Sequence, residues 1–172
     1  MRIVRFTVLA GILLLAIISD YRAWKIPNAL IVFGWMSSIC WNVGQHGLQS
    51  GAWHWLSGAV IPIITLWLFF LTHTIGSGDI KLFSVIGSFY GVCFFLWTFA
   101  AAILIAGIMS LFQLVREDIL AVRLQYLANY LSNFTKERKL RVYYHRESDS
   151  EKPIIHLSGA IAGGYVIALV LM

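Results

Sequence analysis

Charged residues are scarce in this chain of 172 residues. Only 12% of its residues are Asp, Glu, Lys or Arg, and 59% are hydrophobic, whereas a soluble domain carries about 25% charged residues. So few charged side chains cannot cover the surface of a soluble domain of this length. Together with a mean hydropathy of +0.78, the composition predicts an all-α polytopic membrane protein that lies in a lipid bilayer.

Cysteine is nearly absent, and histidine is not clustered. The two cysteines, Cys40 and Cys93, each lie within an apolar stretch and form no Cys-x-x-Cys pair. The five histidines show no spacing typical of metal ligands. We therefore predict no metal site and no cofactor, and we interpret the cysteines as small buried hydrophobic residues.

Apolar runs divide the chain into about six expected membrane helices. The expected spans are residues 3–19, 28–43, 53–72, a short and a longer helix within 82–115 that separate near Gly87 to Gly91, and 154–172. No small-x-small cleavage site precedes Asp20, so we expect the first run to be kept as a span. The whole chain, 1–172, is expected to form one membrane-embedded domain, with glycine-rich residues 44–52 as a link and residues 116–152 as a polar loop.

The basic residues predict how these spans are oriented. Alternating spans place 11 of the 13 Lys and Arg residues on one side of the membrane, and only Arg2 and Arg5 on the other. Basic loops stay in the cytoplasm. The net charge of +5 is therefore read as a topology signal, and we predict no binding to nucleic acid.

Two acidic residues stand apart from the rest. Six of the eight lie between Glu117 and Glu151, and the other two, Asp20 and Asp79, fall at the expected cytoplasmic boundary of two spans. A carboxylate at a membrane segment costs about 2.5–3.5 kcal/mol, so it needs a partner or a function. Two carboxyls held close together share one proton and can act as general base and general acid, as in aspartic proteases.

The residues around Asp79 have their own expected roles. Gly76 and Gly78 would allow unusual backbone angles and let a substrate strand approach the acid closely. Lys81 could tune Asp79 or extend to the lipid headgroups, and the second role is the more usual one for a lysine at a membrane boundary.

Two motifs resemble those of the prepilin peptidases, which are membrane aspartic proteases of bacteria. Residues 76–82, Gly-Ser-Gly-Asp-Ile-Lys-Leu, resemble the signature Gly-x-Gly-Asp-x-Lys-Leu, and Ile26-Pro27-Asn28 follows Asp20 at the interval found in that family. The resemblance implies a catalytic pair, Asp20 and Asp79. It implies a supporting or substrate-binding role for Gly76, Gly78, Lys81, Ile26, Pro27 and Asn28.

The implied activity is removal of the short basic leader from type IV prepilin or pseudopilin precursors, at the cytoplasmic face of the bacterial inner membrane. No paired Cys-x-x-Cys motif is present, so the chain resembles the peptidase-only members that serve tight-adherence (Flp-type) pili, and N-methylation is not implied. A noncatalytic membrane component of a pilus or secretion machine is the main alternative. A small proton-coupled transporter is another. The pilin substrate, the oligomeric state, the role of the polar loop and the aspartate that holds the proton are left open.

Overall fold

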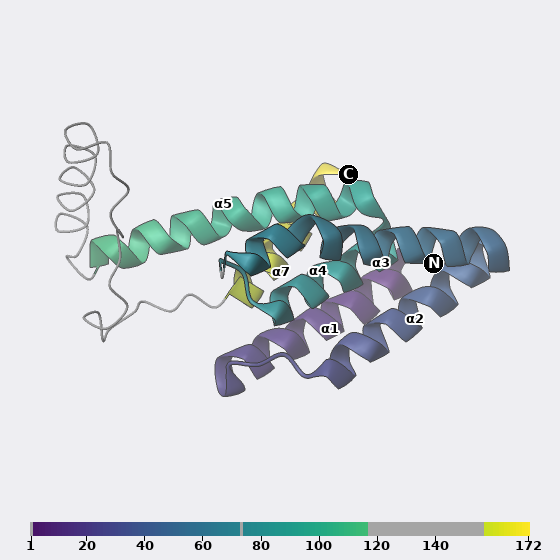
Figure 1. The fold of residues 1–172 in the computed structure, drawn as a ribbon, viewed down its shortest axis with the longest axis horizontal. Coiled ribbons are helices and arrows are strands. Elements are labelled where there is room, and N and C mark those ends of the chain that lie inside the picture. Colours follow the sequence, from purple (N-terminus) through teal and green to yellow (C-terminus); the bar gives the residue numbers. More distant parts are fainter. Residues whose placement is uncertain (1, 73, 117–156) are drawn as a thin grey trace. The chain divides into compact units, whose positions relative to one another are not determined.

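The computed structural model describes residues 2–72, 74–116 and 157–172, and these residues form helices and no strand. The prediction of an all-α protein is therefore confirmed. The described helices are α1 (Arg2–Ala23), α2 (Asn28–His46), α3 (Leu48–Leu71), α4 (Ser77–Tyr90), α5 (Val92–Arg116) and α7 (Leu157–Leu171) (Figure 1).

The chain divides into two compact units. The first comprises residues 1–105 and 156–172, and it contains both Asp20 and Asp79. The second comprises residues 106–155, of which the structure describes only the end of α5. The predicted polar loop, 116–152, therefore lies outside the described residues except for Arg116, and the single-domain organisation stays a prediction.

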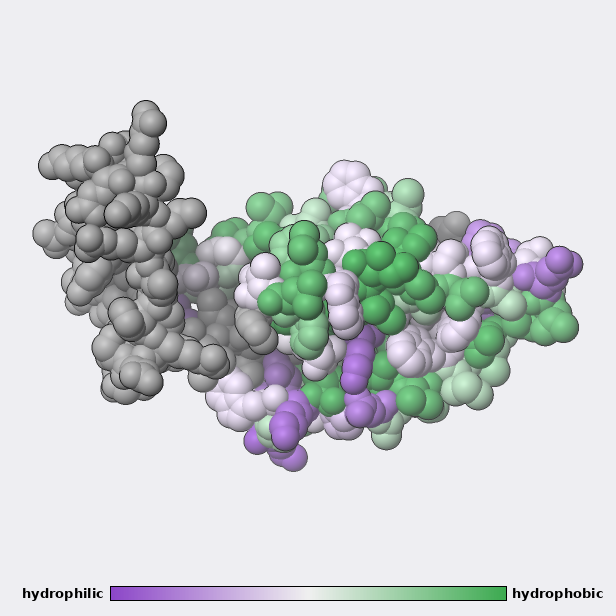
Figure 2. Space-filling view, in the orientation of Figure 1, coloured by the Kyte–Doolittle hydropathy of each residue, from purple (hydrophilic) through white to green (hydrophobic). Residues whose placement is uncertain are grey.

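In the described part of the chain, three helices are long and apolar enough to cross a membrane: Val4–Ala23, Leu48–Leu71 and Val92–Gln113. Helix α7 is apolar but shorter, at 15 residues. On the face shown in Figure 2, hydrophobic residues cover much of the described surface and hydrophilic residues form small patches. An apolar outer surface is what a lipid environment requires, because lipid tails solvate apolar side chains as well as a protein core does.

The same reasoning corrects the interpretation of the cysteines. Cys40 and Cys93 are both exposed rather than buried. In a chain with an apolar exterior, an apolar stretch does not distinguish a core position from a lipid-facing one.

Glycines set two of the helix boundaries. Gly91 separates α4 from α5 as expected, and its φ of 91° lies in the left-handed region that favours glycine. The predicted link over residues 44–52 is wrong, because α2 continues to His46 and α3 begins at Leu48. Gly47 alone, with a φ of 79°, reverses the chain there.

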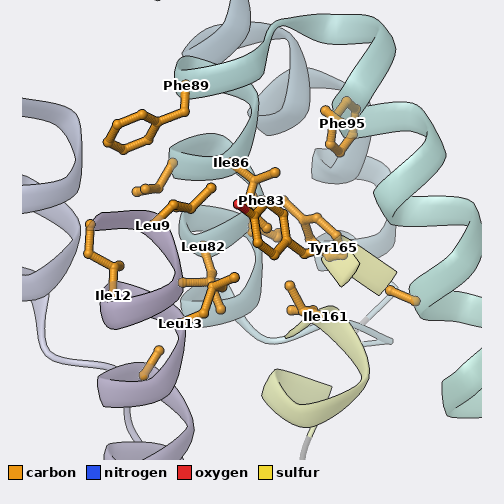
Figure 3. Close-up of a cluster of buried hydrophobic side chains, with 14 of the residues drawn as sticks. Leu9, Ile12, Leu13, Leu82, Phe83, Ile86, Phe89, Phe95, Ile161 and Tyr165 are labelled. Carbon is orange, nitrogen blue, oxygen red and sulfur yellow. The ribbon is translucent and has the colours of Figure 1, made fainter. Parts of the chain in front are cut away.

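Helix α4 lies at the centre of the first unit. All eight residues from Leu82 to Phe89 are buried, and α4 packs against α1, α2, α3 and α7. Figure 3 shows side chains of α1, α4, α5 and α7 meeting in this core; among those labelled are Leu9, Ile12, Leu13, Phe83, Ile86, Phe95, Ile161 and Tyr165. This packing fixes the position of the first turn of α4, where Asp79 lies.

Small and polar residues join α4 to α2 and α3. The backbones of α3 and α4 touch at Gly58 and Gly87, where a Cβ on either glycine would overlap the carbonyl oxygen of the other. The Trp35 indole N–H donates to Ser84 Oγ at 3.1 Å, and that hydroxyl donates to the Ala59 carbonyl at 2.7 Å. Close backbone approach and hydrogen bonds between helices are typical of helix packing in membranes.

Candidate active site

Asp20 lies in the last turn of α1, where the chain turns toward α2. The Trp24 N–H donates to the Asp20 carbonyl at 2.9 Å. Trp24 has a φ of 54°, the left-handed conformation that ends many helices and that costs a non-glycine residue about 1–2 kcal/mol. Ser19 Oγ donates to the Lys25 carbonyl at 2.8 Å, which closes the turn. Pro27 then precedes α2 with a φ of −62°.

Asp79 lies in the first turn of α4, just after an extended residue, Gly76. The expectation that Gly76 and Gly78 adopt unusual backbone angles is wrong, since Gly76 has a φ of −70° and Gly78 is helical. What matters is the missing Cβ. A Cβ on Gly76 would lie 3.1 Å from Asp79 Oδ2, and one on Gly78 would lie 3.4 Å from the Ile26 side chain.

The two sequence motifs contact each other. Ile26 packs against Gly78, and Lys81 Nζ donates a hydrogen bond to Asn28 Oδ1 at 2.9 Å. The segment between α1 and α2 is therefore held against the beginning of α4. Lys81 thus forms a link between α4 and α2, and this contact differs from the headgroup role expected of it.

A pocket of about 400 Å³ lies where these segments meet. The end of α1 and the beginnings of α2 and α4 that form it can be followed in Figure 1. Its lining includes both aspartates and every predicted site residue except Pro27, together with three residues that sequence reasoning did not select: Trp24, Lys25 and Ser77. The structure therefore brings Asp20 and Asp79, 59 positions apart in the sequence, to one pocket.

The surroundings of Asp79 favour its neutral form. Burial, and to a lesser extent the nearby charge of Asp20, raise the pKa of this carboxyl from 3.8 to about 6. A hydrogen bond from the backbone of Gly76 opposes the change. Asp79 lies outside the three candidate membrane spans. Near pH 6 this pair can therefore hold one proton and one negative charge, the state required of an acid and a base that work together.

Ser158 of α7 also reaches the pair, and sequence reasoning missed it. This buried side chain donates from its Oγ to Asp20 Oδ2 at 2.6 Å. Its partner is 138 residues away in the sequence, so no local spacing marks it.

Comparison with known proteins assigns the family. The sequence profile of the type IV leader peptidase family matches residues 7–111, a range that contains Asp20, Asp79 and all six supporting residues. No curated protein and no solved structure matches the chain. The chain belongs to the type IV leader peptidase family.

Proposed function

We propose that this member of the type IV leader peptidase family is a membrane aspartic endopeptidase. It removes the short basic leader from type IV prepilin or pseudopilin precursors, at the cytoplasmic face of the bacterial inner membrane. The observation that carries the proposal is the meeting of Asp20 and Asp79 in one pocket, where burial and the charge of Asp20 raise the pKa of Asp79 to about 6. Hydrolysis of a peptide bond without a covalent intermediate can be catalysed by two carboxyls, one ionised as the general base and one neutral as the general acid.

The chemistry needs one water molecule and the proton that the pair already holds. The ionised aspartate takes a proton from the water as its oxygen attacks the scissile carbonyl carbon, and the neutral aspartate donates its proton to the carbonyl oxygen. In the second step the carbon–nitrogen bond breaks. The leaving amine then receives a proton from the carboxyl that became protonated, and the other carboxyl recovers its own from the collapsing intermediate. Water is thus added across the peptide bond and the pair returns to its starting state.

The expected topology supports cleavage from the cytoplasmic side. With 11 of 13 basic residues on one side, the positive-inside rule places both aspartates at the cytoplasmic boundary. A basic leader is retained on that side by the same charge asymmetry. Its apolar helix would then lie in the bilayer, with the cleavage site next to the pocket.

The test is co-expression with a type IV prepilin, followed by immunoblots that separate precursor from mature pilin. Asp20→Asn and Asp79→Asn should each abolish cleavage while the protein still inserts in the membrane, because Asn keeps the size of the side chain but cannot exchange the proton. Ser37→Ala is the control, since this half-buried serine donates to the Phe33 carbonyl of its own helix. EDTA should not slow cleavage, because a carboxylate pair activates water without a metal ion.

The same experiment separates the rival functions. A noncatalytic assembly component or a proton-coupled transporter would leave the precursor uncleaved by the wild-type protein as well. A leader moved across the membrane, behind an exported domain, should escape cleavage. Efficient processing of that exported leader would mean that the active site faces the other side.

A further inference from the structure

The hydrogen bond from Ser158 to Asp20 connects α7 directly to the carboxyl pair. Ser158 is 0% exposed, and its distance of 2.6 Å to Asp20 Oδ2 is typical of a hydroxyl that donates to a carboxylate. Helix α7 packs against both α1 and α4. The hydroxyl is therefore held in place by the core and not by a mobile surface segment.

A hydrogen-bond donor to only one carboxyl of a pair gives the two carboxyls different tendencies to ionise. A hydrogen bond to an ionised group stabilises the charged form relative to the neutral form. Asp79 accepts a hydrogen bond from the backbone of Gly76. Among the described residues, no side-chain hydroxyl is found to donate to it. The one proton of the pair is then expected on Asp79 and the negative charge on Asp20.

Resting on the proposed peptidase function, we propose that Ser158 is a positioning residue that keeps Asp20 ionised and correctly oriented. Asp20 is thereby assigned the role of general base toward the attacking water. Asp79 is assigned the role of general acid toward the scissile carbonyl oxygen. Asp20 Oδ2 is occupied by the serine, which leaves Oδ1 to accept the proton of the water.

The other charged groups near the pair do not stabilise the negative charge on one aspartate in preference to the other. The cations that line the pocket are Lys25, from the segment between α1 and α2, and Lys81 of α4. Lys81 is engaged with Asn28 Oδ1, and Lys25 is exposed. The acid that faces Asp20 is Asp79 itself. Of the described groups, Ser158 is the one whose hydrogen bond singles out Asp20.

The test measures cleavage of a purified prepilin by the full-length enzyme in detergent, as kcat and KM over a range of pH. Ser158→Ala should lower kcat about 10- to 100-fold, the loss expected for a hydrogen bond to a charged group, with KM little changed. The acidic limb of the kcat profile should move to higher pH, because the hydrogen bond that stabilises the ionised base is lost. Ser88→Ala is the matched control. It removes another buried serine hydroxyl, bonded to Ser38 and Val85, and should leave the position of the acidic limb unchanged.

A second pair of variants separates the hydroxyl from the packing. Thr and Val have nearly the same shape, so Ser158→Thr should retain the wild-type acidic limb while Ser158→Val shifts it. Equal loss of activity in both would assign Ser158 to packing and overturn the proposal, as would a wild-type profile in Ser158→Ala. Asp20→Asn and Asp79→Asn are measured alongside. If either one still cleaves the precursor, the proposed function fails; if both are inactive and Ser158→Ala is unaffected, only the role of Ser158 fails.

Discussion

Replacing Asp79 by Asn should make the protein more stable at pH 8 while it abolishes cleavage. The pKa of Asp79 is raised from 3.8 to about 6, chiefly by burial and then by the charge of Asp20. At pH 8 the folded protein must therefore hold an ionised carboxylate in surroundings that favour the neutral acid. Asn is neutral at every pH, and it keeps a carbonyl oxygen that can accept the hydrogen bond from the Gly76 backbone.

The sign and size of the effect follow from proton linkage. Below pH 3.8 both the folded and the unfolded forms carry a protonated Asp79, so this group gives no pH dependence. Between pH 3.8 and about 6 the folded form binds more protons than the unfolded form, and stability falls as pH rises. Above that window the loss is complete. At 1.36 kcal/mol for each pH unit it reaches at most about 3 kcal/mol, and we expect about 1–3 kcal/mol because the half-buried carboxyl is partly solvated.

Thermal unfolding in detergent at pH 4, 6 and 8 provides the assay. The wild-type protein and Asp79→Asn should differ little at pH 4, and the variant should be the more stable at pH 8. Taking the difference between the two proteins cancels the titration of the other carboxylates. Asp20→Asn serves as the control, since it removes the second cause of the shift but leaves burial, the largest cause, so its pH dependence should shrink without vanishing. A difference between wild type and Asp79→Asn that is the same at pH 4 and pH 8 would refute the reasoning.

Three further predictions follow from the contacts of α4. The cleavage rate of the wild-type enzyme should fall about tenfold for each pH unit above pH 6, as the pKa of Asp79 is about 6 and the acid is lost; a rate that is flat to pH 8 would exclude Asp79 as the acid. Gly87→Ala should destabilise the protein by about 1–3 kcal/mol in thermal unfolding, because its Cβ would overlap the backbone of α3, whereas the control Gly11→Ala, with nothing within 4 Å of its Cβ, should be neutral or stabilising. Lys81→Ala should reduce cleavage far less than the aspartate substitutions do. Because the lysine bonds to Asn28, adding Asn28→Ala should cost little more, and fully additive losses would show that the two side chains act separately.

Much of the fold is predictable from the sequence because a bilayer permits few backbone structures. Each apolar run must satisfy its own backbone hydrogen bonds, so it forms a helix. Five of the six expected runs coincide closely with α1, α2, α3, α5 and α7. The break at Gly91 is predictable as well, because a glycine between two apolar runs is the residue that tolerates a φ of 91°.

Two boundaries were not predictable from hydropathy. Residues 44–52 have the composition of a link, yet all but Gly47 are helical. Gly51 is instead required because a Cβ there would overlap the backbone of Asn42 and Val43. Helix α4 begins at Ser77, before the apolar run starts, because its first turn is stabilised by tertiary contacts to Ile26 and Asn28. Hydropathy predicts which segments lie in the bilayer, but it does not predict which helices pack against each other.

Some residues of the candidate site can likewise be predicted from the sequence, and others cannot. Asp20 and Asp79 can be chosen from the sequence because an acid at a membrane boundary is costly and these two have no acidic neighbours. The structural role of Gly76 and Gly78 cannot be predicted in this way. The missing Cβ matters only because the Asp79 carboxyl lies beside Gly76 and the Ile26 side chain lies beside Gly78. The contact between Lys81 and Asn28, 53 positions apart, is invisible for the same reason.

Ser158 shows how far the site extends beyond its motifs. The family match ends at residue 111, and both motifs lie within it, but the donor to Asp20 comes from α7. Two carboxyls alone in a pocket are chemically similar, and hydrolysis requires that one of them accept a proton while the other donates one. A hydroxyl on one carboxyl supplies that difference. The motifs therefore bring the pair together, and on the proposed assignment the packing of α7 against α1 and α4 determines which member of the pair is the base.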